Sequence, residues 1–333
     1  MVMGYHYTAK FGEAYGHPTA LPFEVTFGFY GVRLFFMVSG FVIFMTLERV
    51  SDYKDFIVSR FARLYPAYWA SVLLTYLVIS ICSLPGREVG RRVVLINMTM
   101  FQHWFNVDHV DGVYWTLSIE MSFYAIMLVI FLLRSLNKIQ GIAVIWLCVM
   151  VLTRILDNSG VLKIPGLLQE LFLLEYGNLF FAGIMFFKLR KNGIKAFTNL
   201  IILAALVVEC YIRGFESALI TSVFFALFYC IIFEVPFVNL LLKTKVFVFL
   251  GTISYSLYLL HQNIGYVLLL KLYALGLNPI AATLTVSTAM FVLAACMTAY
   301  VETPLRETIR RWHGCRKEKR LQLAASRNSM DLT

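Results

Sequence analysis

The feature that most constrains this chain is a series of apolar runs that recurs from one end of the sequence to the other. Many of these runs approach the length of about 20 residues that a helix needs to cross a hydrocarbon core of roughly 30 Å. Hydrophobic residues make up 60% of the 333 residues and charged residues only 14%, whereas soluble domains contain roughly 25% charged residues. The sequence therefore predicts an all-α, polytopic membrane protein.

Breaks between the apolar runs mark the ends of the expected spans. Residues 1–9 have the character of the last turns of one more helix, so we expect about ten transmembrane helices, the first of them truncated at its N-terminus. The segment 93–105, "VVLINMTMFQHWF", is too short and too polar to count as a span. The nine other spans are expected near 27–48, 64–84, 113–133, 141–157, 167–187, 197–213, 217–236, 246–270 and 279–301.

Positive charge gathers beside the spans and at the C-terminal end. The formal net charge is +10, and eight of the 29 lysines and arginines follow Glu302. Basic clusters of this kind mark cytoplasmic loops and contacts with anionic lipid, so we expect membrane lipids and no nucleic acid among the partners. Both termini are then cytoplasmic, and we expect a transmembrane domain at 1–303 and a basic tail at 304–333 that is disordered at its end.

One basic segment departs from this distribution. "GREVGRR", at 86–92, places Arg87, Arg91 and Arg92 on the side that is otherwise poor in lysine and arginine. Two explanations stay open at this point. Either the charge rule is overridden locally, or the segment 93–105 dips into the membrane.

Polar residues inside the spans are the candidates for chemistry, because the six cysteines are scattered and indicate neither a disulfide framework nor a metal site. A polar group inside a span is costly unless it has a partner or water. Glu120 lies at helical distances from Trp115, Ser118 and Tyr124. It is either a polar clamp between helices or one wall of an active-site cavity. Glu209 lies near the end of a span and is expected to be either structural or at the interface.

Two further groups of residues leave alternatives open. Arg60 and Arg63 are three residues apart and therefore share a helical face. They are either anchors at the cytoplasmic mouth of a span or a pair of guanidinium groups that binds a phosphorylated ligand. His6 is bracketed by Tyr5 and Tyr7. It is either structural or a general base, for which the proton affinity of histidine is suited near neutral pH.

Five stretches occur in a fixed order along the chain: "YGVRLFFMVSGFVIF" (30–44), "FIVSRFARLYPAYW" (56–69), "VYWTLSIEMSFY" (113–124), "LGTISYSLYLLHQNI" (250–264) and "VETPLR" (301–306). Together they resemble the acyltransferase family 3 membrane proteins, a group that includes bacterial O-acetyltransferases of lipopolysaccharide and exopolysaccharide. The resemblance covers essentially the whole chain. It implies a ten-helix domain that transfers an acyl group, usually acetyl, from cytoplasmic acyl-coenzyme A to a hydroxyl of an extracytoplasmic or lipid-linked glycan.

The resemblance also implies roles for particular residues. His6 matches the catalytic histidine of the family, and Arg60 and Arg63 match its paired arginines, which are implicated in handling acyl-coenzyme A. Glu120 matches the acidic residue after the Trp-x-Leu-Ser signature, and either Glu120 or another cavity residue is expected to orient the His6 imidazole. The residues expected to line the substrate cavity are Arg33, Ser39, Trp115, Ser118, Tyr255 and His261. Arg33 stands where relatives often have aspartate, and it is expected to supply charge near His6.

The family also carries a basic residue eleven positions before the catalytic histidine, which here would precede Met1. A start codon assigned too far downstream, a truncated gene and a divergent protein that tolerates the loss are the three explanations, and we favour the first. We expect acyl-coenzyme A as a co-substrate without a bound cofactor or metal, in the bacterial inner membrane. A glycan or lipid transporter without chemistry and an inactive family member are the alternatives.

Overall fold

The structure is a computed structural model that describes residues 1–330, except for the side chains of residues 320, 321 and 323–330. Every regular element in this range is helical. The helices are α1 (Val2–Tyr5), α2 (Phe11–Tyr15), α3 (Gly31–Leu47), α4 (Tyr53–Cys82), α5 (Arg91–Asn97), α6 (Trp115–Leu132), α7 (Ile139–Asn158), α8 (Gly166–Leu171), α9 (Gly177–Asn192), α10 (Ala196–Arg213), α11 (Phe215–Ile232), α12 (Pro236–Leu242), α13 (Lys245–Ala274), α14 (Pro279–Met297) and α15 (Thr303–Met330).

The prediction of an all-α, polytopic membrane protein is confirmed, with fewer spans than the ten expected. Within residues 1–330, seven helices are long and apolar enough to cross a membrane, or eight if α12 and α13, which meet at a 60° bend, form one span. Two expected spans are absent from this count. The first helix runs only from Val2 to Tyr15, and α9 has 16 residues.

Two boundaries differ from the expectation in ways that affect the site. α4 begins at Tyr53, where the side chain of Asp52 caps it by accepting a hydrogen bond from the backbone N–H of Lys54 at 2.9 Å. The expected loop at 49–63 is therefore largely helical, and it carries Arg60 and Arg63 on the first turns of α4. Pro66 lies inside the helix.

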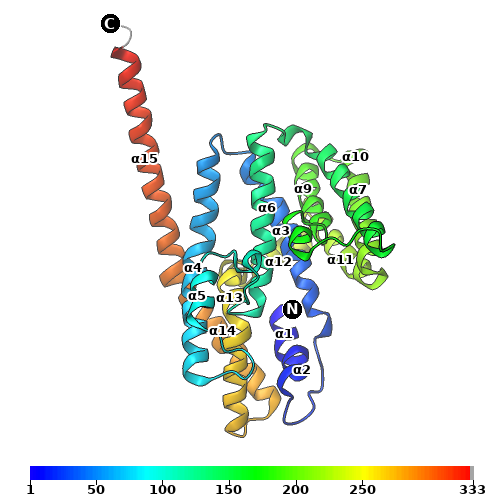
Figure 1. Cartoon of the computed structure of the whole chain (residues 1–333), viewed down its shortest axis with the longest axis vertical. Helices are drawn as coiled ribbons and strands as arrows, with labels where there is room; N and C mark the ends of the chain where they lie inside the picture. Colours follow the sequence, from blue (N-terminus) through cyan, green and yellow to red (C-terminus); the bar gives the residue numbers. More distant parts are fainter. Residues whose placement is uncertain (331–333) are drawn as a thin grey trace.

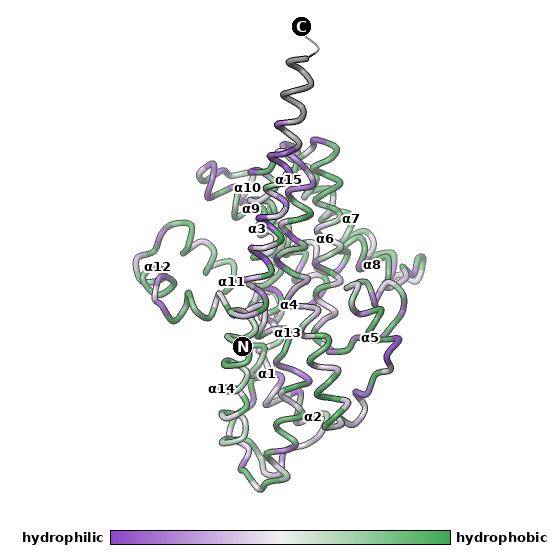
Figure 2. The backbone as a smooth tube through the Cα atoms, turned by 90° about the vertical axis from the view of Figure 1, so that its left-hand side faces the viewer, coloured by the Kyte–Doolittle hydropathy of each residue, from purple (hydrophilic) through white to green (hydrophobic). Residues whose placement is uncertain are grey.

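The first helix and the last one occupy different levels of the molecule (Figure 1). Met1 lies at mid-height against the bundle, and α15 extends from the bundle toward the opposite end from α2. Both termini were expected on the cytoplasmic side, and that expectation stays a prediction. The tail expected to be disordered at its end is helical as far as Met330, and residues 331–333 lie outside the described residues. Figure 2 shows that the described part of α15 is more hydrophilic than the bundle.

The segment between α4 and α6 turns back along α4. The Tyr65 hydroxyl donates to the Thr99 carbonyl at 2.9 Å, and the Trp69 indole N–H donates to the Met98 carbonyl at 2.8 Å. Tyr65 is 17 residues from the end of α4 at Cys82, which is about 25 Å along a helix. Residues 93–105 therefore return along the bundle without crossing it, which favours the second alternative, a segment that dips.

Close packing of α3 against α9 fixes the centre of the bundle. A Cβ atom added to Gly40 would overlap the Phe180 carbonyl, and one added to Gly183 would overlap the Met37 carbonyl. Glycines let the two backbones approach as closely as they do in other membrane helix pairs. This contact sets the position of α3, which carries Arg33 and Ser39.

Candidate active site

Two adjoining cavities lie among α1, α3, α4, α6 and α13. The first, here called the His6 chamber, has a volume of about 390 Å³ and is lined by His6, Lys10, Arg33, Arg87 and Arg213 among others. The second, here called the Arg60 chamber, has a volume of about 360 Å³ and is lined by Arg60, Arg63, Glu120, Ser39 and Tyr255 among others. The two chambers share three lining residues, here called the junction: Val2, Val32 and Tyr258.

His6 lies where the first helix widens into a π-helical turn, His6–Lys10. π-Helical turns inside α-helices are frequent at functional sites, because the extra residue re-aims the side chains around it. The His6 Nδ1 atom lies 3.1 Å from the Tyr266 hydroxyl on α13. Its Nε2 atom makes no hydrogen bond to the described side chains or backbone, so it is available to a ligand in the chamber.

His261 lies behind His6 and lines neither chamber, which corrects its expected place in the cavity. The two imidazole centroids are 5.0 Å apart. The His261 Nδ1 atom donates to the carbonyls of Tyr258 at 2.8 Å and Leu257 at 3.2 Å. Because both partners are acceptors, Nδ1 carries the proton, and the buried Nε2 atom is left without a partner. His261 therefore presents an acceptor nitrogen within the core beside His6.

Glu120 belongs to the Arg60 chamber and not to the chamber of His6. Its Oε1 atom accepts hydrogen bonds from Ser39 at 2.8 Å and from Tyr124 at 2.6 Å, and its buried Oε2 atom has no partner. Of the two alternatives for the residue that orients His6, the structure does not support Glu120, since Tyr266 contacts the imidazole. Helical spacing on α6 gave no information about which neighbouring helix the carboxylate faces.

The two arginines of α4 have different partners. Arg63 forms an ion pair with the buried carboxylate of Glu302, which also accepts from Ser256 at 2.9 Å. Arg60 donates only to neutral hydroxyls, at 3.1 Å and 3.5 Å, and its buried Nε atom has no partner. Among the described residues, no carboxylate pairs with Arg60. The charge of Arg60, unlike that of Arg63, is therefore available to an anionic ligand in the Arg60 chamber.

The other residues expected in the cavity divide between the two chambers. Arg33 and Trp115 line the His6 chamber. Ser39 and Tyr255 line the Arg60 chamber. Ser118 lines neither; its buried hydroxyl has no partner.

Three cations of the His6 chamber were missed by the sequence reasoning: Lys10, Arg87 and Arg213. Arg87 comes from the segment "GREVGRR", whose charge was unexplained. Arg91 and Arg92 of that segment are exposed, whereas Arg87 is half-buried in the chamber wall. For Arg87 the exception to the charge distribution therefore has a structural reason, because the loop after α4 brings this arginine to the cavity.

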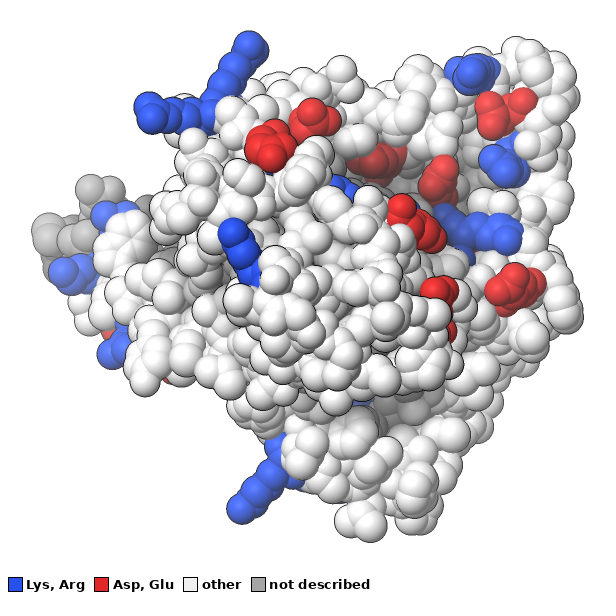
Figure 3. Space-filling view, turned by 90° about the horizontal axis from the view of Figure 1, so that it is seen from below, with Lys and Arg blue, Asp and Glu red and all other residues white. Residues whose placement is uncertain are grey.

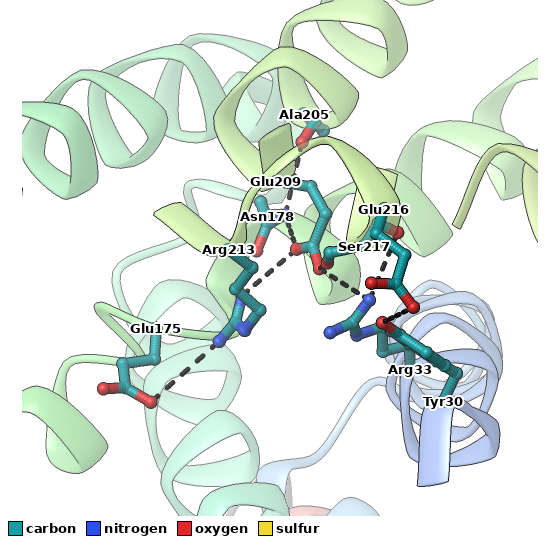
Figure 4. A network of polar contacts seen from close by, with 9 residues as sticks. All are labelled: Tyr30, Arg33, Glu175, Asn178, Ala205, Glu209, Arg213, Glu216 and Ser217. Carbon is teal, nitrogen blue, oxygen red and sulfur yellow. Dashed lines mark hydrogen bonds and ion pairs between the residues drawn. The ribbon is translucent and has the colours of Figure 1, made fainter. Parts of the chain in front are cut away.

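Arg33 and Arg213 share one buried carboxylate, that of Glu209 (Figure 4). Glu209 is fully buried, which fits the structural alternative and not the interfacial one. Its place on the inner face of α10 was not visible from its nearness to the end of a span.

The comparison with known families decides what the two chambers belong to. A family model described as an acyltransferase domain (Acyl_transf_3) matches residues 1–300. The chain belongs to this acyltransferase family. No curated protein and no solved structure matches the chain. The match covers α1 to α14, which carry the linings of both chambers, so the chambers are those of a membrane acyltransferase.

Proposed function

We propose that this membrane acyltransferase transfers an acyl group, acetyl in the simplest case, from cytoplasmic acyl-coenzyme A to a hydroxyl of a cell-envelope or exported glycan. The observation that carries the proposal is the junction between the two chambers. It lies between an arginine without a carboxylate partner and a histidine with an available ring nitrogen. A donor in one chamber and an acceptor in the other meet at this junction.

Arg60 binds the phosphates of coenzyme A in this proposal. A guanidinium group suits phosphate because it offers a planar fork of N–H donors, and no described carboxylate competes for Arg60. Arg63 is already paired with Glu302 and shapes the wall of the chamber. The pantetheine arm of the donor lies in the Arg60 chamber, and the thioester reaches the junction.

His6 is the general base in the same proposal. Its Nε2 atom accepts the proton of the acceptor hydroxyl while the hydroxyl oxygen bonds to the thioester carbon. The carbon–sulfur bond then breaks, and the imidazolium returns the proton to the coenzyme A thiolate. A positioned base commonly contributes about 10²–10⁴ in rate. The hydrogen bond with Tyr266 holds the ring, and Arg33 or Arg87 stabilises the negative charge that develops on the carbonyl oxygen.

The proposed location is the bacterial inner membrane with a cytoplasmic C-terminus. The basic residues of the loops and of α15 support this orientation. Figure 3 looks at the opposite end of the molecule from below and shows acidic side chains interspersed with lysine and arginine over the upper and right-hand parts of the face. The mixture of signs at this end fits an extracytoplasmic surface.

The test supplies labelled acetyl-coenzyme A to membranes from cells that express the chain and measures label in the envelope glycans by mass spectrometry. We compare wild type with His6→Ala and with His103→Ala, since His103 lines neither chamber. The proposal predicts label that His6→Ala abolishes and His103→Ala preserves. Equal label in all three would remove His6 from the mechanism. If cells that express His6→Ala still export the glycan and no label is found in it, the result would favour the alternative of a transporter without chemistry.

A further inference from the structure

The His6 chamber contains an arginine pair whose charge is only partly matched. Arg33 Nη1 lies 3.3 Å from Glu209 Oε1, and Arg213 Nη1 lies 3.1 Å from Glu209 Oε2. Two guanidinium groups therefore share one carboxylate. Buried charge is costly unless it is paired, so this group of three residues favours a further anion.

Glu209 is fully engaged and holds both arginines in place. Besides the arginines, its carboxylate accepts from the Asn178 amide at 2.8 Å and from the Ser217 hydroxyl at 2.7 Å. Together with Arg213 and the Arg33 ion pair, these donors occupy both oxygens of a side chain that is fully buried, and Arg33 Nη1 also donates to the Ser217 carbonyl at 3.2 Å. The carboxylate cannot turn to satisfy further donors on Arg33 or Arg213, which leaves those donors for a ligand.

Arg213 has a buried donor without a hydrogen-bond partner. Its Nη2 atom makes no hydrogen bond to any described residue. Glu175 forms a long ion pair with this atom, at 4.0 Å, from a side chain that is half exposed. Because an unmet donor on a charged group costs free energy inside a protein, the Nη2 atom marks a position for an acceptor oxygen.

Aromatic rings fix the planes of the two guanidinium groups. The Arg33 Cζ atom lies 4.2 Å from the centre of the Tyr30 ring, and the Arg213 Cζ atom lies 4.1 Å from the centre of the Tyr176 ring. Figure 4 shows the two arginines on opposite sides of Glu209 and pointing toward it. Arg33 comes from α3, and Arg213 comes from α10, the helix that also carries Glu209. Both arginines line the His6 chamber. Because the rings and Glu209 hold them, their positions are set before a ligand arrives.

The rest of the chamber wall strengthens the positive charge. Lys10 and Arg87 also line it, and its described lining contains no aspartate or glutamate. Lys10 pairs with Glu13 at 2.8 Å, and Arg87 makes no ion pair with a described residue. A neutral sugar has no need of this surface, whereas an oxyanion gains charge-assisted hydrogen bonds from it.

We infer that the acceptor carries an oxyanion, a carboxylate or a phosphate, which Arg33 and Arg213 bind while its hydroxyl faces His6. This inference rests on the proposed acyl transfer, because it names the substrate class of the same site. The oxyanion source is a uronic acid, a phosphorylated glycan or the pyrophosphate of a lipid carrier. All three present the same oxygen acceptors to the guanidinium forks.

A binding measurement tests the inference without relying on catalysis. Ligand-observed NMR on the purified full chain in nanodiscs compares methyl glucuronide and glucose 6-phosphate with methyl glucoside as the neutral probe. At least one anionic probe is expected to bind about tenfold more tightly than the neutral one. Arg213→Gln is expected to abolish this preference and Arg213→Lys to reduce it, since lysine keeps the charge and loses the fork. Arg92→Gln, an exposed arginine outside the chamber, is the matched control.

Equal binding of the anionic and neutral probes, or a preference that survives Arg213→Gln, would overturn the inference. The product of the labelling experiment then identifies the source of the anion. His6-dependent label is expected to bind to an anion exchanger, and mild acid, phosphatase and carboxyl reduction separate the lipid pyrophosphate, the phosphate and the uronic acid. His6-dependent label on a neutral glycan would also overturn the inference. Anion binding without any label would leave the arginine site standing and contradict the acyl transfer.

Discussion

Replacing either arginine of α4 by glutamine is predicted to produce opposite kinds of defect. The resemblance gives Arg60 and Arg63 the same role, whereas the structure gives them different partners. Arg63 pairs with the buried Glu302, and Arg60 has no carboxylate partner among the described residues. Arg60→Gln is therefore expected to weaken donor binding without unfolding the bundle. Arg63→Gln is expected to destabilise the bundle.

The structure sets the magnitudes of both effects. A hydrogen bond to a charged group contributes roughly 1.5–3 kcal/mol, so Arg60→Gln is expected to raise KM for acyl-coenzyme A about 10- to 100-fold. Breaking a buried ion pair costs about 3–5 kcal/mol. The Arg63 side chain is 31% exposed and Arg306 remains 3.4 Å from Glu302, so the expected loss of stability for Arg63→Gln is smaller, about 1–3 kcal/mol.

The assay combines thermal unfolding in nanodiscs with steady-state transfer from acetyl-coenzyme A. Glu302→Gln in the Arg63→Gln background serves as the matched control, because it removes the buried charge that the first substitution leaves with Arg306 as its remaining cationic partner. The double variant is expected to recover much of the lost stability. Equal destabilisation by Arg60→Gln and Arg63→Gln, or an unchanged KM in Arg60→Gln, would refute the assignment of different roles.

Three further predictions follow from the packing and the hydrogen bonds. Gly183→Ala forces α3 and α9 apart and is expected to abolish accumulation of folded protein in membranes, whereas Gly251→Ala, which meets no atom within 4 Å, is expected to leave it unchanged. Tyr266→Phe removes the partner of His6 and is expected to lower kcat about tenfold or more with KM unchanged, while Tyr273→Phe, which lies outside both chambers, changes neither. Burial and a neighbouring carboxylate raise the pKa of Glu170 to about 7. Because a raised carboxyl pKa makes the folded state less stable as pH rises from about 5 to 7, the free energy of unfolding is expected to fall over this range. Unfolding measured at both pH values is expected to show a smaller fall for Glu170→Gln.

The membrane spans, and the residues that lie in the family motifs, were the features of this protein that the sequence could predict. Long apolar runs have few alternatives to membrane helices, and the resemblance placed His6 and Arg60 in chambers that adjoin. One expected span falls on α9, which has only 16 residues. The basic stretch that follows α9 resembles the end of a span in sequence, so the number of spans was overestimated there.

The remaining contacts depend on how helices pack, which periodicity along one helix does not encode. Glu120 was expected beside His6 through the family resemblance, yet α6 turns its carboxylate toward Ser39 on α3. The sequence left a structural and an interfacial position open for Glu209, and the Asn178 amide on α9 donates to its carboxylate in the core. Arg87 was visible only as an exception to the charge distribution.

The most direct test of the account is a cryo-EM structure of the full chain with a non-transferable acetyl-coenzyme A analogue, in which the sulfur is replaced by a methylene group. The account predicts the phosphates at Arg60, the pantetheine arm in the Arg60 chamber and the acetyl carbonyl at the junction formed by Val2, Val32 and Tyr258. An analogue bound with its acetyl group away from this junction, or with its phosphates in the His6 chamber, would contradict the account.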